Sequence, residues 1–134
     1  MNILLDASTI MAIILNEQNR DKVIAWTKNA AILSPEIISF EIGNALISLF
    51  KQHKISEEEL LRAYKSYTSI PIRNIRVNIE KALKIACKYN IYAYDAYYLE
   101  IACRLKLPLI SFDESMKKAG LDLKINIVDK QMEE

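Results

Sequence analysis

The sequence predicts a single α/β domain in which helices cover both faces of a mostly parallel sheet of four to five strands. Short apolar runs alternate with longer amphipathic segments along the whole chain, as in parallel strands joined by helices. The 134 residues suffice for one hydrophobic core but not for two domains. Hydrophobic residues make up 51% of the chain and charged residues 26%, an ordinary globular composition. We therefore assign residues 1–134 to one domain.

Five short apolar runs predict the strands. Each is bounded by polar or turn-forming residues, as expected of strands that are buried between helices. In chain order the expected strands cover residues 2–5, 30–34, 70–75, 109–112 and 124–129. The run "IPIRNI" is the weakest of the five and is expected at an edge of the sheet. Residues 130–134 are expected to fray.

Seven segments with helical periodicity predict the helices between these strands. In chain order they cover residues 9–16, 20–30, 36–54, 56–67, 78–90, 94–106 and 114–120. Local start signals support three of them. Ser8 or Thr9 can cap the first helix, and Pro35 suits the first turn of the third. Ser56 and Glu59 form a capping box at the start of the fourth.

The charge balance and the opening segment bear on location. The formal net charge is +1, so the whole-molecule field favours neither nucleic acid nor a membrane. The opening "MNILLDASTIMAIILN" lacks a basic start, is interrupted by Asp6 and is short for a membrane-spanning helix. We therefore expect a cytoplasmic protein without a membrane partner. Cys87 and Cys103 lie in helical patterns and are expected to be small buried side chains.

Asp6 and Asp113 each directly follow a predicted strand. The carboxyl ends of strands in an α/β sheet share one edge, where ligands bind, so both side chains are expected there. Each could instead serve only as the N-cap of the following helix, because Asp is a favoured capping residue.

Glu41 and Asp95 stand on helix faces that otherwise carry apolar residues, and Asn44 lies on the same face as Glu41. Asp95 heads the apolar stripe of its helix, whereas Glu100 and Arg104 are expected to pair on a different face, in water. The alternatives are a surface glutamate at the edge of an apolar stripe and a first-turn acid favoured by the helix dipole.

The four acids together predict a metal site. Ionised carboxylates gathered at one sheet edge repel one another, and a bound divalent cation removes that cost. An all-oxygen ligand set suits Mg²⁺ or Mn²⁺. The predicted ligands are Asp6, Glu41, Asp95 and Asp113.

The chain resembles the PIN-domain family of metal-dependent ribonucleases, in particular the small VapC-type toxins of toxin–antitoxin pairs. The matching segments are "LLDAST", "SPEIISFEIGNAL", "YAYDAYYLEIACRLKLPLISFD" and "INIV", in this order. The resemblance implies a three-layer α/β/α fold and an endoribonuclease dependent on Mg²⁺ or Mn²⁺. It makes the same four acids the catalytic and metal-binding set, with Asp113 acting directly or through water. Ser8 and Ser111 correspond to small hydroxyls near the metal, and Asn44 is a further residue expected there.

The resemblance also implies an RNA substrate, a cognate antitoxin and a homodimer. Several helical segments are more apolar than one covered sheet face needs, so we expect a partner surface and an antitoxin that is basic at the contact. Two other functions stay open: a non-catalytic PIN-like scaffold that binds RNA or protein, and a housekeeping RNA-processing nuclease. A receiver domain or a haloacid-dehalogenase-like phosphatase fits poorly, since Leu5 precedes Asp6 and Ser8 stands where the phosphatase has a second Asp.

Five tyrosines lie between residues 89 and 98, around Asp95. Unpaired RNA bases stack on exposed aromatic rings, so we expect at least one of Tyr94, Tyr97 and Tyr98 to be exposed beside the metal. The others are expected to pack in the core or in an interface. The expected phosphate-binding residues are Arg73, Arg76, Lys117 and Lys118.

Overall fold

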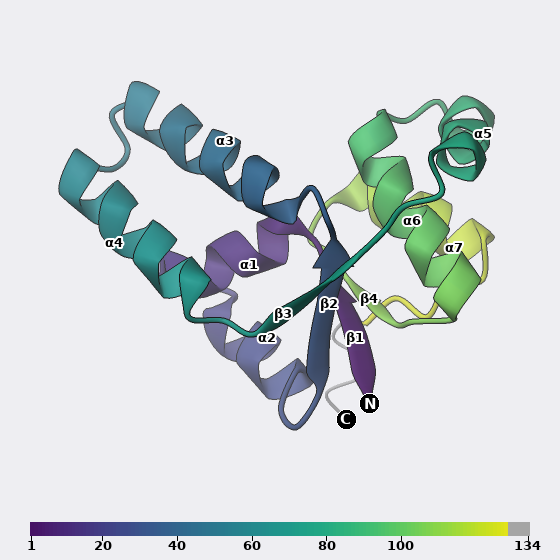
Figure 1. The fold of residues 1–134 in the computed structure, drawn as a ribbon, viewed down its shortest axis with the longest axis horizontal. Helices are drawn as coiled ribbons and strands as arrows, with labels where there is room; N and C mark the ends of the chain where they lie inside the picture. The colour runs from purple at the N-terminus through teal and green to yellow at the C-terminus, as the bar shows by residue number, and fades with distance from the viewer. Residues whose placement is uncertain (129–134) are drawn as a thin grey trace.

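The computed structural model describes residues 1–128, which form four strands and seven helices (Figure 1). The strands are β1 (Asn2–Leu5), β2 (Ala31–Pro35), β3 (Ile72–Ile75) and β4 (Leu109–Ile110). The helices are α1 (Ala7–Ile14), α2 (Arg20–Trp26), α3 (Ile38–Lys51), α4 (Glu57–Thr68), α5 (Ile79–Tyr89), α6 (Ala93–Leu105) and α7 (Glu114–Asp122).

The four strands of the described region are parallel and lie in the order β3-β2-β1-β4. Helices α1 to α4 gather on one side of this sheet and α5 to α7 on the other (Figure 1). The predicted three-layer α/β/α class is therefore confirmed, with β3 at the edge as expected. Because all four strands run the same way, their carboxyl ends meet at one edge of the sheet.

The core is built around the central strand β1. Its residues Ile3, Leu4 and Leu5 are at most 1% exposed, because neighbouring strands flank β1 and helices cover both of its faces. Ile42 of α3 and Leu99 of α6 are fully buried and belong to the same core. An uninterrupted apolar run is what such a two-sided environment requires.

The helix starts differ from prediction at two places. Asp6, and not Ser8 or Thr9, caps α1, since its side chain accepts a hydrogen bond from the Thr9 backbone N–H. Pro35 completes β2, so α3 begins at Ile38 and not at residue 36. The Ser56 capping box is confirmed, with both of its reciprocal hydrogen bonds present.

The last predicted strand is reduced to one parallel bridge, between Leu109 of β4 and Ile127. Backbone hydrogen bonds from Leu109 to Asn126 and from Val128 to Leu109 hold this segment beside β4. The predicted strand end at Asp129 and the frayed tail over residues 130–134 lie outside the described residues.

Two predictions about burial are wrong. Cys87 and Cys103 are exposed, because they fall on the outward sides of α5 and α6. Glu100, expected in water, is only 2% exposed, since α6 packs against both α5 and α7 as well as the sheet. Over the part of the chain that the structure describes, no helix combines the length and the apolar character needed to cross a bilayer.

Candidate active site

Asp6 lies at the centre of a hydrogen-bonded network at the carboxyl end of β1. Its Oδ1 accepts hydrogen bonds from the Ser8 hydroxyl (2.7 Å) and the Thr9 backbone N–H (3.0 Å). Its Oδ2 accepts a third from the Ser111 hydroxyl (2.6 Å). The Asp113 backbone N–H donates to the same Ser111 oxygen (3.0 Å). Asp6 is thus a helix cap, as the alternative interpretation had it, and it also joins the ends of β1 and β4.

Hydrogen-bond donors around Asp6 offset part of the cost of burying its negative charge. Burial raises the pKa of this carboxyl above its ordinary range, and the hydrogen bonds from Ser111, Ser8 and Thr9 oppose that shift. All of these partners donate, which is the arrangement that favours the ionised form. Three of the roughly four lone-pair positions of a carboxylate are occupied, so one is left for a cation.

Glu41, in the first turn of α3, is held by Tyr98 of α6. The Tyr98 hydroxyl donates a 2.8 Å hydrogen bond to Oε1 of Glu41. The pKa of Glu41 is raised to about 7, mainly by burial and to a smaller extent by the charges of Asp6 and Asp95, while the Tyr98 hydrogen bond partly offsets the rise. Glu41 therefore belongs to the acidic network, and the alternative of a solvated surface glutamate is wrong.

Tyr98 is a residue whose role the sequence interpretation missed. It was expected as a possible stacking platform, but it is only 1% exposed and cannot receive a base. Its position three residues after Asp95 places both residues on one side of α6, which is the signal that could have indicated a role inside the site. Burial and the neighbouring Glu41 charge raise the pKa of Tyr98, so its hydroxyl keeps its proton and acts as a donor.

Asp95 and Asp113 complete the acidic group from the other side of the sheet. Asp95 lies in the first turn of α6, and its pKa is raised to about 6 by burial and then by the charges of Asp113 and Asp6. Asp113 caps α7 through a 2.8 Å bond from the Met116 backbone N–H to Oδ1. The other carboxylate oxygen of Asp113, Oδ2, takes no part in the cap and is available to a ligand or water.

The structure thus brings all four predicted acids, with Ser8 and Ser111, to one edge of the sheet. Asp6 is electrostatically coupled to Glu41 and Asp95, and Asp95 to Asp113. Among residues 1–128, however, no three His, Cys, Asp or Glu side chains are spaced to hold a metal ion by themselves. Carboxylate oxygens are ligands that Mg²⁺ takes, with water completing its coordination. The donor chemistry and the free lone pair of Asp6 fit the same ion.

A cavity of about 390 Å³ opens on the Glu41 side of the acidic group. Phe40, Glu41 and Asn44 of α3 line it together with Tyr94 of α6. Tyr94 is 57% exposed, so the expectation of an exposed tyrosine in this region is confirmed for that residue. Asn44 is exposed and on the same helix face as Glu41, as predicted.

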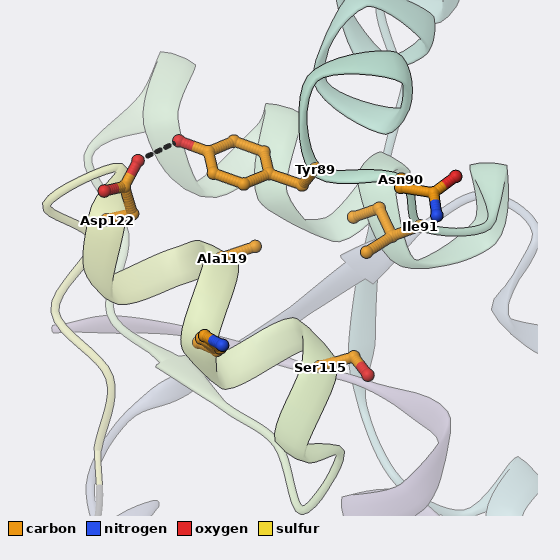
Figure 2. A pocket seen from close by; sticks show the side chains of 7 residues that line it. Tyr89, Asn90, Ile91, Ser115, Ala119 and Asp122 are labelled. Atoms are coloured by element: carbon orange, nitrogen blue, oxygen red, sulfur yellow. Dashed lines mark hydrogen bonds between the residues drawn. The ribbon is translucent and has the colours of Figure 1, made fainter.

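A second cavity, of about 370 Å³, lies between the α5–α6 connection and α7 (Figure 2). The Tyr89 hydroxyl donates to the carboxylate of Asp122 across one end of it, and Ile91 and Ser115 lie toward the other end (Figure 2). Ser115 belongs to the first turn of α7, the helix that Asp113 caps. This cavity therefore flanks the acidic group on the Asp113 side.

The four basic residues expected to bind phosphate lie in different parts of the structure, and not all of them are near the acids. Lys118 lines the second cavity and is exposed. Lys117 forms a 3.1 Å ion pair with Glu114. Arg76 directly follows β3 at the carboxyl edge of the sheet. Arg73 lines a cavity at the amino ends of β2 and β3, away from the acids, so its expected place beside them is wrong.

Comparisons with known proteins bear on the family and the fold. The family model described as "PIN domain" matches residues 3–121. A search of the curated proteins finds no match.

Solved structures share the fold over most of the chain. PAE2754 from Pyrobaculum aerophilum is 24% identical, with a TM-score of 0.72 over 98% of this chain and 94% of that one. The sarcin–ricin-loop-cleaving toxin VapC20 of Mycobacterium tuberculosis is 14% identical, with a TM-score of 0.63 over 88% of this chain and 95% of its own. A toxin–antitoxin complex from Klebsiella pneumoniae contains a chain that is 17% identical, with a TM-score of 0.57 and coverage of 83% and 86%.

Proposed function

The chain belongs to the PIN domain family, and from this premise we propose that it is a metal-dependent endoribonuclease, the toxin of a VapC-type toxin–antitoxin pair. The observation that carries the proposal is the coupling of four acids from α3, α6 and the ends of β1 and β4 into one network. Four mutually repelling carboxylates weaken a fold unless a cation binds them.

Asp6, Glu41, Asp95 and Asp113 would hold Mg²⁺ or Mn²⁺, in part through bound water. When bound, the ion supplies neutralisation of the phosphodiester charge and activation of water. Ser8 and Ser111 fix the orientation of Asp6.

Side chains of the chain itself would orient the attacking water, position the Glu41 carboxylate and bind the neighbouring phosphates. The Oδ2 atom of Asp113 is free of the helix cap and can accept a hydrogen bond from the attacking water. Tyr98 holds the Glu41 carboxylate in place through its hydroxyl. Lys118, at the second cavity, and Arg76, just after β3, would bind neighbouring phosphates, so we expect cleavage to weaken as the salt concentration rises.

The surface supports a protein partner and a second copy of the chain. Large apolar side chains are exposed on two regions: the α3–α4 arm, with Leu61 at 58%, and α5, with Leu83 at 47%. We expect a homodimer and an antitoxin that is basic where it meets the acids. Light scattering of the wild type and of Leu61→Lys and Leu83→Lys would identify the dimer face, and a wild-type monomer at micromolar concentration would contradict the dimer.

The decisive experiment measures cleavage of a single-stranded RNA by the purified chain, with Mg²⁺, with Mn²⁺ and with EDTA. We expect divalent-dependent cleavage that Asp95→Asn abolishes while the protein stays folded. Asp21→Asn is the matched control, because Asp21 is a fully solvated acid whose side chain is 97% exposed.

The other functions give different results in this experiment. RNA binding without cleavage in any metal would indicate the non-catalytic scaffold. RNA cleavage by the purified protein, no growth arrest on inducible expression and no neighbouring antitoxin gene would together indicate the housekeeping nuclease.

A further inference from the structure

The cavity beside Glu41 has features that the proposed chemistry does not use. Its two aromatic side chains come from different helices, Phe40 from α3 and Tyr94 from α6. Phe40 is 78% exposed and Tyr94 57%. The small side chains of Ala7 and Ala45 also line the cavity. The Tyr94 ring meets the Tyr97 ring in a T-shaped contact, with centroids 5.7 Å apart, and the rest of its surface is open to the cavity and solvent.

Packing does not explain this exposure. The core of the same helices is filled by Ile42 and Leu46 of α3 and by Leu99 of α6, all of them buried. Phe40 contributes little to that core, since most of its surface is in water. A large apolar ring kept in solvent beside a polar site is typical of a binding surface.

The polar wall of the cavity indicates the chemistry of the occupant. Asn44 lies four residues after Phe40 and three after Glu41, so it neighbours each of them on α3, and all three line the cavity. The amide of Asn44 is exposed and offers one acceptor and two donors side by side. An asparagine amide pairs bidentately with the N6 and N7 edge of adenine.

The location favours RNA over an apolar protein side chain. Glu41 lines the cavity and is also one of the four acids, so an occupant sits directly beside the point where a phosphodiester must lie. In a nucleotide chain each phosphate is followed by a flat base. Such bases stack on aromatic rings whatever the sequence. An apolar side chain of a partner would cover the Asn44 amide without offering it a hydrogen-bonding partner.

We propose that this cavity is a nucleobase subsite, in which Phe40 and Tyr94 hold an unpaired base next to the scissile phosphate and Asn44 selects adenine. The proposal rests on the proposed ribonuclease function and adds the substrate feature that the site selects. It predicts a preference for adenine at one fixed position beside the cut.

The first test measures base stacking without cleavage. The Asp95→Asn protein is titrated into a short single-stranded RNA that carries one 8-vinyladenosine, a fluorescent adenine analogue that keeps N6 and N7, in the presence of Mg²⁺. We expect binding to quench the 8-vinyladenosine fluorescence. Adding Phe40→Leu or Tyr94→Leu should weaken binding by about tenfold and remove most of the quenching. Tyr92→Leu is the matched control, because Tyr92 is 83% exposed in the same segment but does not line the cavity.

The second test measures selectivity with active protein on RNAs randomised around the cut. Sequencing of the cleaved ends should show adenine enriched at one position by the wild type, and an unselective distribution at that position for Asn44→Ala.

The outcomes separate the two proposals. Quenching without cleavage by the wild type supports the subsite and contradicts the ribonuclease. Cleavage with wild-type affinity, quenching and selectivity in all three variants overturns the subsite and leaves the ribonuclease intact. Unchanged RNA binding together with loss of dimerisation or antitoxin binding in Phe40→Leu assigns the cavity to a protein partner and also overturns the subsite.

Discussion

The hydroxyl of Tyr98 donates a 2.8 Å hydrogen bond to Oε1 of Glu41, across 57 positions of sequence. This bond connects α6, which carries Asp95, to α3, which carries Glu41. The spacing between two of the four acids therefore depends on a residue that is itself buried and not acidic. Replacement of that residue tests whether the spacing matters.

We expect Tyr98→Phe to raise the Mn²⁺ concentration needed for half-maximal cleavage by about tenfold, since hydrogen bonds to charged groups contribute roughly 1.5–3 kcal/mol. Saturating Mn²⁺ should restore much of the rate, because the carboxylate itself is retained. Tyr97→Phe, which keeps its ring and removes a hydroxyl outside this bond, should behave as the wild type. A Tyr98→Phe protein with unchanged Mn²⁺ dependence would show that the bond only supports packing.

Substitutions of Asp6 should separate its capping role from its role in the acidic group. Asp6→Asn keeps an oxygen for the Thr9 N–H and removes a buried charge, so we expect no loss of stability but no cleavage. Asp6→Ala removes the cap and the acceptor of the Ser8 and Ser111 hydroxyls. It should lower the free energy of unfolding by about 2 kcal/mol.

Urea unfolding and cleavage assays on both variants check this prediction. Equal destabilisation by Asn and Ala would mean that the charge of Asp6, and not its acceptor oxygens, supports the fold.

Stability should fall with rising pH when divalent metal is absent. The pKa values of Glu41 and Asp95 are raised to about 7 and about 6 in the folded chain, whereas unfolded carboxyls titrate near about 4. The folded state therefore binds more protons between about pH 4 and pH 7, and the free energy of unfolding decreases across this window. Allowing for solvent screening of these half-buried groups, the decrease is on the order of 1–2 kcal/mol.

Urea unfolding in EDTA at about pH 5 and about pH 7.5 measures the effect. Mg²⁺ should restore stability at the higher pH, and Glu41→Gln with Asp95→Asn should flatten the dependence. Greater stability at the higher pH in EDTA would contradict the raised pKa values.

The ion pair of Glu100 and Arg104 should stabilise the fold more than an exposed pair with the same four-residue spacing. Glu100 is buried, and Arg104 binds both of its oxygens, at 2.7 and 3.2 Å. Arg104 also donates to the backbone oxygen of Arg76 (2.7 Å), which connects α6 to the segment after β3. Arg104→Ala should cost about 3 kcal/mol, since it leaves a buried carboxylate uncompensated.

The Glu58–Arg62 pair is the matched control, with the same spacing but both side chains mostly in solvent. Arg62→Ala should cost less than about 0.5 kcal/mol. Thermal or urea unfolding of the two variants measures the difference, and equal costs would show that burial adds nothing to this pair.

The sequence by itself determined the elements and the identity of the acids. Strand runs, helical periodicity and caps such as that of Ser56 act within a few residues, so they are readable without the fold. The rule that parallel strands share a carboxyl edge placed Asp6 and Asp113 together in advance. A charged residue on an apolar stripe identified Asp95 in the same way, because burial of an unpaired acid is costly.

Only the tertiary structure decided which atoms meet. Ser111 and Asp6 are 105 positions apart, and the hydrogen bond between them exists because β1 and β4 are neighbours in the sheet. Glu100 looked solvated because its partner lies one turn away, and it is buried because α5 and α7 pack on both sides of α6. The periodicity of one helix reports the direction of its side chains but not what covers them, since that depends on elements brought in from elsewhere in the chain.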